Sequence, residues 1–381
     1  MAQTQTSPGE RMRRITVDYE RPYELWLETL PIPIHTGYYV EDVRTVEVAW
    51  WEERGCNAAI LKLAGQEGIT EARVTEIPPG KSLRPLKFAL DEIVYVADGR
   101  GLTTVTPPDG GAPRTFEWQT HSLFMLPRNC THQLSNAQGN RPARLLHYNH
   151  LPIAMTLAPD PEFFFDNPYG RSDSLAAAGA DFYSEAKISM PVEGKNAPGL
   201  SQGMAYWLGN FFPDMQAWDS LVPFRGRGAG GHVVWIRYPG STITNHMSVF
   251  PAQTYKKAHR HGPGVVIIIP GGEGYSVMWE EGKDKVFIPW HEGSVFVPPN
   301  RWFHQHFNVG GAAGRYLAFH APRGVMQSER IEDRARDQIE YPDEDPWIRQ
   351  TFESELRKRG LVSLMPEKAY QDRAYEWDYQ S

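Results

Sequence analysis

Two pairs of histidines in the C-terminal half have a spacing that suits a shared metal ion. His259 and His261 are two residues apart, and so are His304 and His306. On a β-strand, side chains two residues apart point to the same face and lie about 6–7 Å from each other. Imidazoles at that separation can bind one divalent ion at about 2.0–2.2 Å per bond. The sequence therefore predicts a metal site, provided that the two pairs lie on strands that face each other.

The segments around these histidines have the length and composition of β-strands. Glycine (34 residues) and proline (31 residues) separate short apolar runs. Runs of this kind, flanked by turn-forming residues, are Glu92–Ala97, Ser122–Leu126, Val265–Ile269 and Ser294–Val297. No strand–helix–strand rhythm is evident, which disfavours a parallel doubly wound sheet. Helices are expected only at Asp173–Ala180 and at Asp345–Lys358, where Pro346 and Gly360 mark the start and the end.

An internal repeat indicates that the chain uses one β-unit twice. Aligning Gly101 with Gly274, which are 173 residues apart, also aligns Pro78 with Pro251. Further pairs at this offset, or one residue from it, are Leu86 with His259, Phe88 with His261, His147 with His320, His132 with His304, and Asn136 with Asn308. Matching positions over about 70 residues are typical of a repeated supersecondary unit. The predicted fold class is therefore all-β, with two tandem barrels and a few connecting helices.

The two repeats resemble the motifs of the cupin superfamily, which are G-x5-HxH-x3-4-E-x6-G and G-x5-PxG-x2-H-x3-N. The resemblance covers residues 46–155 and 231–325 and implies two tandem double-stranded β-helix (jelly-roll) barrels, a bicupin. It divides the chain into an N-terminal arm, a first barrel, a connector, a second barrel, and a C-terminal helix and tail. The expected bounds of these parts are 1–45, 46–155, 156–230, 231–325 and 326–381.

The second repeat departs from the first motif, because Gly262–Val266 follows HRH without the motif's glutamate. The segments AHRHGPGVVIIIPGGEG and RWFHQHFN are similar to those of the gentisate and salicylate ring-cleaving dioxygenases, which also lack that glutamate. This resemblance implies that His259, His261 and His304 ligate Fe(II). His306 would then act as an acid/base residue beside the iron. The implied activity is that of a non-haem iron dioxygenase, which cleaves a hydroxylated aromatic substrate with O2 in aromatic-compound catabolism.

The ligand types alone support a similar expectation. Three neutral imidazoles leave the full +2 charge on an ion and about three coordination positions open, which suits a chelating anionic substrate together with O2. A closed structural zinc site usually needs cysteines, and none lie near these histidines. Fe(II) is the expected ion, with Mn, Ni and Zn left open. Two alternatives also stay open: a non-oxidative metal enzyme (lyase, isomerase or hydrolase) and a non-catalytic bicupin that binds a ligand.

The substrate pocket shows one difference from the ring-cleaving enzymes. Those enzymes have an arginine shortly after HRH that helps to seat the substrate carboxylate, whereas this chain has Ile267 in an apolar run. Arg301 or Arg237 could take over that role. The other candidate pocket residues are Trp302, Asn308, His320 and Trp235, with His320 also a fallback ligand and His246 a further inward-facing candidate.

The first barrel is expected to hold no metal ion. Leu86 and Phe88 occupy its HxH positions, which leaves His132 as the ligand-type residue there. One imidazole binds a divalent ion weakly, so this barrel is interpreted as a structural or dimerisation unit. An apolar ligand between Leu86, Phe88 and Phe124 is an alternative to an interior filled by side chains. The remaining histidines of this half, given a structural role, are His121, His147 and His150.

Composition narrows the partners and the location. The net charge is −7 and no dense basic block occurs, which disfavours nucleic acid. Val265–Ile269, the longest strongly apolar run, is far shorter than the ~20 residues of a membrane span, and the N-terminus has no apolar leader. Two cysteines, Cys56 and Cys130, suit a reducing cytoplasm. The expected partners are a small-molecule substrate and O2, in a homo-oligomer (dimer or tetramer), with the acidic, aromatic segment Tyr341–Trp347 as a candidate subunit-bridging arm.

Overall fold

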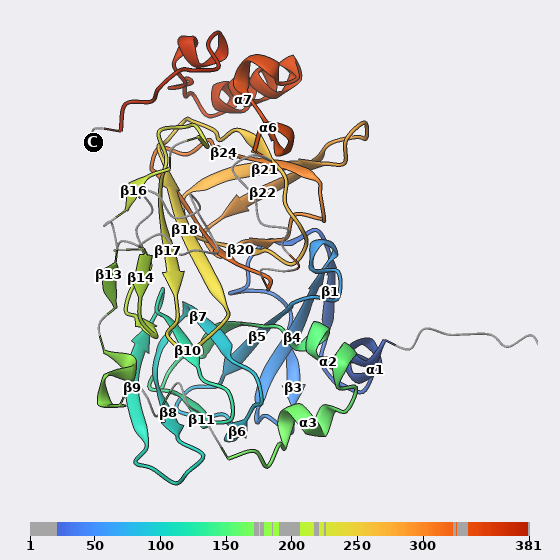
Figure 1. Cartoon of the computed structure of the whole chain (residues 1–381), viewed down its shortest axis with the longest axis vertical. Coiled ribbons are helices and arrows are strands. Elements are labelled where there is room, and N and C mark those ends of the chain that lie inside the picture. Colours follow the sequence, from blue (N-terminus) through green and yellow to red (C-terminus); the bar gives the residue numbers. More distant parts are fainter. Residues whose placement is uncertain are drawn as a thin grey trace, which may run out of the picture.

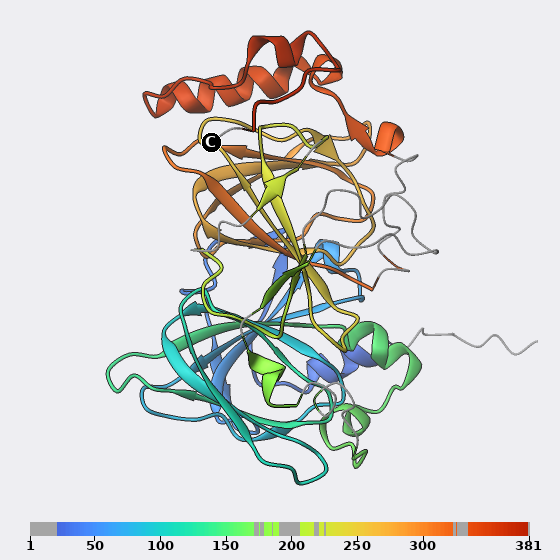
Figure 2. The same cartoon turned by 60° about the vertical axis from the view of Figure 1, so that its left-hand side comes forward.

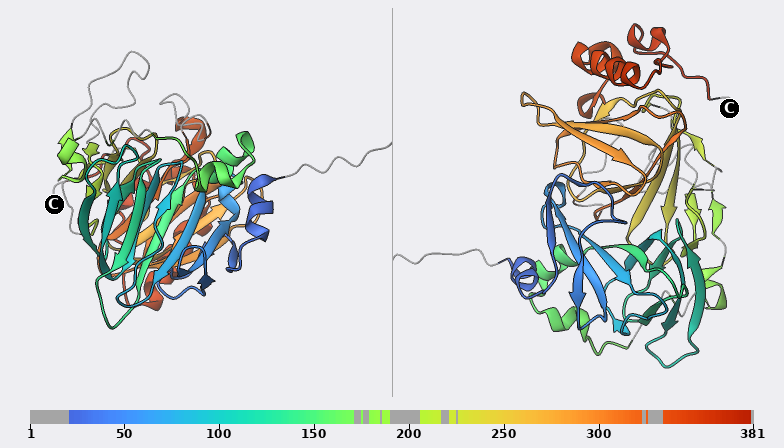
Figure 3. Two further views of the ribbon diagram at one scale, coloured as in Figure 1. Left: turned by 90° about the horizontal axis from the view of Figure 1, so that it is seen from below. Right: turned by 180° about the vertical axis from the view of Figure 1, so that it is seen from behind.

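The structure is a computed structural model that describes residues 21–170, 175, 179–184, 186–189, 206–216, 221–224, 226–322, 325 and 334–379. Its strands form two barrels, with the first below and the second above in Figure 1. The same two barrels are seen from behind in Figure 3. The predicted all-β class with two tandem barrels is therefore confirmed. The helix expected at Asp173–Ala180 falls mostly outside the described residues.

The first barrel consists of two facing sheets. The larger sheet runs in the order β1 (Ile34–Gly37), β4 (Cys56–Leu63), β5 (Glu71–Ile77), β12 (Ala143–Asn149), β7 (Glu92–Asp98), β10 (Leu123–Leu126) and β15 (Phe211–Phe212), with β3 (Ala49–Trp51) paired to β4. The smaller sheet runs in the order β6 (Leu86–Lys87), β11 (Thr131–Asn136), β8 (Arg100–Thr106) and β9 (Arg114–Gln119). The strands β7 and β10 lie where the sequence predicts strands.

The second barrel repeats this arrangement. Its larger sheet runs in the order β13 (Lys187–Ser189), β14 (Tyr206–Leu208), β17 (His232–Arg237), β18 (Thr244–Phe250), β25 (Gly314–Phe319), β20 (Val266–Gly271), β23 (Val295–Phe296) and β2 (Tyr39–Val40), with β16 (Val222–Pro223) paired to β17. The smaller sheet runs in the order β22 (Val286–His291), β21 (Glu273–Trp279), β24 (Phe303–Asn308), β19 (Ala258–His259) and β26 (Gln338–Ile339). The predicted strands at Val265–Ile269 and Ser294–Val297 correspond to β20 and β23.

Equivalent close contacts in the two barrels confirm the internal repeat. A Cβ atom on Gly101 would lie 2.3 Å from Cζ2 of Trp118, and a Cβ atom on Gly274 would lie 2.4 Å from Cζ2 of Trp290. Both glycines begin the strand that follows the first motif, and both tryptophans come from the neighbouring antiparallel strand. Each barrel thus needs a residue without a side chain where an indole crosses the sheet.

The larger sheets of the two barrels pack against each other. In β20, Val266 and Ile268 belong to the apolar core shared with the first barrel, whereas Ile267 and Ile269 face the interior of the second barrel. A strand that is buried on both faces needs apolar residues at successive positions, which explains the run Val265–Ile269. The shared core fixes the two barrels to each other over a broad surface.

Three short helices in the first half were not expected from the sequence. They are α1 (Pro22–Glu28), α2 (Leu151–Leu157) and α3 (Pro161–Phe165). Each has a proline in its first turn but at most seven residues, too few for a periodic apolar pattern to stand out. Short 3-10 turns among the described residues are η2 (Ala64–Gln66), η3 (Gly179–Tyr183), η5 (Tyr341–Asp343) and η6 (Glu367–Tyr370).

The predicted C-terminal helix is present as α7 (Pro346–Lys358), preceded by α6 (Arg334–Asp337). Asp345 caps α7, because its Oδ1 accepts a hydrogen bond from the backbone N of Trp347 at 2.9 Å. The apolar side of α7 packs with Tyr255 and Phe307 on the outer face of the smaller sheet, and Figure 2 shows the helix above the second barrel. Within this chain the tail therefore covers its own barrel. No helix among the described residues is long and apolar enough to cross a membrane.

Candidate metal centre

Three of the four predicted site histidines gather at one point inside the second barrel. The register of β19 and β24 places His259 directly opposite His304. One ligand nitrogen from each of His259, His261 and His304 lies within 4.8 Å of the others. The ring centroid of His304 is 4.3 Å from that of His259 and 4.7 Å from that of His261. The three side chains are thus close enough to share a single ion.

The backbone orients each of these rings in the same way. Nδ1 of His261 donates to the carbonyl oxygen of Gly262 at 2.7 Å, and Nδ1 of His304 donates to that of Trp302 at 3.2 Å. Nδ1 of His259 lies 3.5 Å from the carbonyl oxygen of Lys257, a longer contact of the same type. A proton held on Nδ1 leaves the lone pair on Nε2, the tautomer that binds metal ions through Nε2.

Burial favours the neutral form of two of these imidazoles. It lowers the pKa of His259 and of His304 well below the usual histidine value, and the nearby positive charge of Arg227 acts in the same direction on both. Neutral imidazole is the form that ligates metals, so the donor set fits a divalent ion. Within the described part of the chain, no carboxylate belongs to this group of ligand atoms.

The first barrel supports the loop that follows His261. The backbone N of Gly264 donates to the carbonyl oxygen of Gly65 at 2.7 Å, and Oγ1 of Thr70 donates to the carbonyl oxygen of Gly264 at 3.3 Å. Gly264 has φ +81°, a left-handed conformation that favours glycine. On the other side, the backbone N of Arg301 donates to the carbonyl oxygen of His261 at 2.8 Å. Both barrels therefore hold the metal-site loop in place.

His306 lies beside the three histidines but outside their group. Its Nδ1 forms a 2.8 Å hydrogen bond with Oγ of Ser276, and its ring centroid is 5.6 Å from that of His304. Burial, together with the charge of Lys256, lowers the pKa of His306 to about 3. The sequence predicts an acid/base role for His306. In the structure its imidazole is neutral and is hydrogen-bonded to Ser276 of the neighbouring strand β21.

The candidate pocket residues take different positions. Ile267 faces the interior of the second barrel, and Trp302 packs against that apolar cluster, with its ring 5.7 Å from that of Tyr38. Asn308 does not line the histidine group: its Nδ2 donates to the carbonyl oxygens of Pro251 and Ala312 at 3.1 and 2.8 Å. Asn308 therefore stabilises the loop after β24. This is a structural role rather than a contact with substrate.

His320, Trp235 and His246 form a separate aromatic cluster. Nδ1 of His246 and Nε2 of His320 are hydrogen-bonded at 2.7 Å. The ring of Trp235 lies 5.2 Å from that of His246 and 5.1 Å from that of His320. None of the three belongs to the ligand group, so His320 is not needed as a substitute for His304.

Both arginines expected as possible carboxylate anchors contact other side chains in this structure. Arg301 donates to Oδ2 of Asp337 at 3.0 Å, and Arg260 donates to Oδ1 of the same carboxylate at 3.2 Å. Burial raises the pKa of Asp337, but the hydrogen bonds from these arginines outweigh it and lower the pKa to about 2. Arg237 is exposed and lies 5.0 Å above the ring of Tyr206. Both arginines thus already have partners in this structure, and a carboxylate-anchoring role for either of them stays a prediction.

The cations near the histidine group are ones that the sequence reasoning missed. Lys256 is 1% exposed and donates to Oγ of Ser248 at 2.5 Å. Arg227 is 9% exposed and donates to Oε1 of Gln338 at 2.8 Å. The only sequence signal was the pair of lysines just before the first ligand, and it does not reveal which lysine points inward.

The first barrel differs from its expectation in one respect. Leu86 pairs with His132 exactly as its repeat partner pairs in the second barrel, so the HxH position is apolar as predicted. However, His132 is not the only ligand-type residue there, because Glu92 is also buried and acts on the pKa of His132. Three residues lie between Phe88 and Glu92, and six lie between Glu92 and Gly99, which is the spacing of the motif glutamate. That spacing was the signal that could have identified it.

Protein side chains neutralise Glu92. Arg73 donates to Oε1 of Glu92 and to Oε1 of Glu71, both at 2.7 Å. Nδ1 of His147 donates to Oε2 of Glu92 at 2.8 Å. The pKa of Glu92 is raised by burial, but Arg73 and His147 outweigh this and hold it well below its usual value. Aromatic side chains such as Phe124 belong to the core here, so the barrel is filled rather than open to an apolar ligand.

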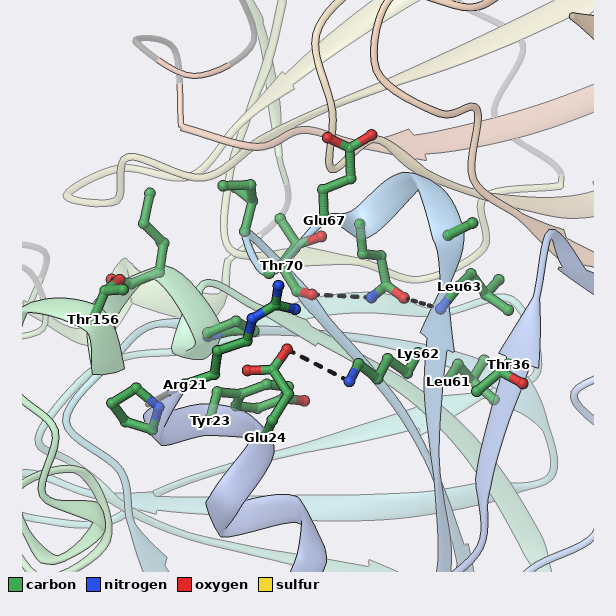
Figure 4. A pocket seen from close by; sticks show the side chains of 17 residues that line it. Arg21, Tyr23, Glu24, Thr36, Leu61, Lys62, Leu63, Glu67, Thr70 and Thr156 are labelled. Carbon is green, nitrogen blue, oxygen red and sulfur yellow. Dashed lines mark hydrogen bonds and ion pairs between the residues drawn. The ribbon is translucent and has the colours of Figure 1, made fainter. Parts of the chain in front are cut away.

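A separate groove lies outside both barrel interiors (Figure 4). It has a volume of about 690 Å³ and is bordered by α1, β4, the loop after β4 and α2. An ion pair of 3.4 Å between Lys62 and Glu24 crosses it, as the dashed line in Figure 4 shows. None of the three clustered histidines lines this groove.

No protein-family model and no curated protein matches the sequence. Among solved structures, the chain is similar to oxalate decarboxylase from Bacillus subtilis. The structure of that enzyme at pH 4.6 is 14% identical, covers 75% of this chain and 76% of the other, and has a TM-score of 0.45. Two mutants of the same enzyme are 13% identical with TM-scores of 0.46, and cover 75% and 79% of this chain and 78% and 84% of theirs. Similarity at this level carries no conclusion about the reaction, which has to come from the site itself.

Proposed function

We propose that this chain is a metal-dependent enzyme of the tandem-cupin fold that acts on a small molecule in the second barrel. His259, His261 and His304 would hold one divalent ion. The observation that carries the proposal is the convergence of three neutral imidazoles within 4.8 Å, with Nδ1 of each ring directed at a backbone carbonyl. Histidines oriented in this way are typical of metal ligands and serve no evident purpose in a metal-free core.

The ion would act as a Lewis acid on a substrate oxygen. The chain's own residues would hold the substrate and manage its charge: Lys256 adds a positive charge to the same interior, and Ser276 fixes the ring of His306 beside the ligands. These groups favour a reaction in which negative charge develops on oxygen without a change of oxidation state. A lyase, isomerase or hydrolase therefore fits the site best, with Mn(II), Fe(II), Ni(II) and Zn(II) all compatible with the donor set.

An Fe(II)-dependent dioxygenase that cleaves a hydroxylated aromatic substrate is the second candidate. It is favoured by one observation: three imidazoles without a carboxylate leave about three coordination positions for a bidentate substrate and O2. The ion pair of Arg301 with Asp337 and the contact of Arg237 with Tyr206 do not affect this coordination argument.

Turnover with different metals tests the two candidates. The full chain, stripped of metal and reloaded anaerobically with Mn(II), Fe(II) or Zn(II), is incubated with small carboxylic acids and with phenolic acids. Product is followed by mass spectrometry and O2 by an electrode. We expect turnover of a carboxylic acid without O2 uptake and with more than one metal. Turnover only with Fe(II), with one O2 used per product, would establish the dioxygenase instead. If the His259→Ala variant is equally active, both candidates fail.

A further inference from the structure

The side chain of Lys256 lies inside the second barrel. Its Nζ donates to Oγ of Ser248, on the face of β18 that also carries Phe250, a member of the interior apolar cluster. Nζ also lies 5.4 Å from the ring centroid of Phe250 and 5.2 Å from that of Tyr316. The amine is therefore surrounded mainly by aromatic faces and has one neutral hydrogen-bond partner.

No carboxylate pairs with Lys256 among the residues that the structure describes. Burial, together with the charge of Arg227, lowers the pKa of this amine to about 7. The next residue provides a contrast, because Nζ of Lys257 forms a 2.5 Å ion pair with Glu340. A buried amine without a counterion is costly, which makes Lys256 the part of this interior that an incoming anion would stabilise most.

Lys256 is adjacent to His306, the histidine that lies beside the group of three candidate ligands. Its backbone N donates to the carbonyl oxygen of His306 at 3.0 Å. The ring of Tyr316 contacts both residues, with its centroid 4.9 Å from that of His306 and 5.2 Å from Nζ of Lys256. A Cβ atom on Gly231 would lie 3.2 Å from this Nζ, so a glycine leaves room for the amine. Lys256 and the candidate ligands thus line the same interior.

We propose that Lys256 binds a carboxylate of the substrate whose other oxygen is held at the His259–His261–His304 centre. The substrate class is then a short-chain carboxylic acid with a second oxygen donor, such as a second carboxylate or a carbonyl. This inference rests on the proposed function, because it needs an ion at the three histidines. It places the carboxylate anchor before the first ligand rather than after HRH, where the ring-cleaving family has its arginine.

Anion binding to the cobalt-loaded full chain tests this inference. The visible spectrum of Co(II) reports ligands that reach the ion, and malonate is the anion used, with neutral malonamide of similar shape as the comparison. Wild type is expected to bind malonate at least tenfold more tightly than malonamide. The Lys256→Met variant, which keeps an unbranched side chain but removes the amine, should bind malonate roughly 30-fold more weakly. Lys256→Arg should recover part of this loss.

Lys257→Met is the matched control, because that lysine already has a carboxylate partner and should leave malonate binding unchanged. Thermal unfolding verifies that each variant is folded, and Lys256→Gln replaces Lys256→Met if the latter is not. Equal malonate affinity in wild type and the folded Lys256 variant overturns the inference while leaving the metal site intact. Failure of wild type to bind Co(II) overturns the proposed function itself, so the two failures are distinguishable.

Discussion

The two barrels differ in the polar side chains that they bury and in the partners of those side chains. In the first barrel, the buried carboxylate of Glu92 is neutralised by Arg73 and His147. In the second barrel, His259 and His304 occupy positions that in the first barrel hold Leu86 and His132, and no carboxylate joins their group within the described residues. In the first barrel, side chains of the chain itself therefore satisfy the buried carboxylate.

The difference shows how one barrel of a repeat can become structural. A guanidinium takes the place of an external cation in the first barrel, so this barrel needs no metal ion to satisfy its glutamate. The second barrel keeps neutral donors oriented by backbone carbonyls and adds an unpaired lysine. Stability should therefore depend on internal ion pairs in the first barrel and on bound ligands in the second.

Removal of the internal cation should have the largest effect on stability. Arg73→Met leaves Glu71 and Glu92 buried without their guanidinium, and breaking such a buried network costs about 3–5 kcal/mol. Urea unfolding at neutral pH measures the loss. Glu92 contributes stability above its unfolded pKa, so the difference from wild type should shrink at acidic pH, where protonated glutamates need no counterion. A loss below about 1 kcal/mol would contradict the comparison.

Removal of a single ligand separates the barrels by metal content. His259→Ala should weaken metal affinity by about a hundredfold or more, which corresponds to about 3 kcal/mol. His132→Ala in the first barrel should leave one ion per chain. Elemental analysis after dialysis against a dilute chelator measures both variants. Loss of the ion in the His132 variant, or its retention in the His259 variant, would contradict the assignment of the metal site to the second barrel.

Lys256, which has no carboxylate partner among the residues that the structure describes, should make the second barrel less stable than it could be. Lys256→Met removes a buried amine and is expected to raise the free energy of unfolding by about 1–4 kcal/mol at pH 6. The folded-state pKa is about 7, whereas an unfolded lysine titrates near ~10.4. Between these values the unfolded wild type binds more protons, so wild type gains stability as the pH rises. The advantage of the variant should therefore fall between pH 7 and pH 10 in chemical unfolding, and a pH-independent difference would argue against a buried amine.

The contact between the barrels should have a smaller influence. A Cβ atom on Gly65 would lie 2.4 Å from the carbonyl oxygen of Pro298, so Gly65→Ala should shift the loop before β24 and cost about 1–3 kcal/mol. Gly139→Ala is the control, because nothing lies within 4 Å of its Cβ position. Isothermal titration with Co(II) should show weaker binding in Gly65→Ala than in the control. Equal affinities would mean that the first barrel does not support the metal site.

The sequence was sufficient for the barrels and for the histidine group because both follow from local spacing. The repeat offset and the i, i+2 pairs depend on strand geometry, which fixes the side-chain face once β19 and β24 form. The motif spacing could also have identified Glu92, but the partners of Lys256 and Arg301 could not be assigned in this way. Which cation faces the site depends on partners far along the chain, such as Asp337 for Arg301. The short helices were missed because their packing, rather than their periodicity, stabilises them.

Anomalous diffraction from crystals of the full chain grown with Mn(II) or Co(II) is the most direct test of the central claim. The account predicts one anomalous peak per chain at bonding distance, about 2.0–2.2 Å, from Nε2 of His259, His261 and His304. A peak at Glu92 and His132 in the first barrel, or three imidazoles that bind no ion at saturating metal, would contradict it.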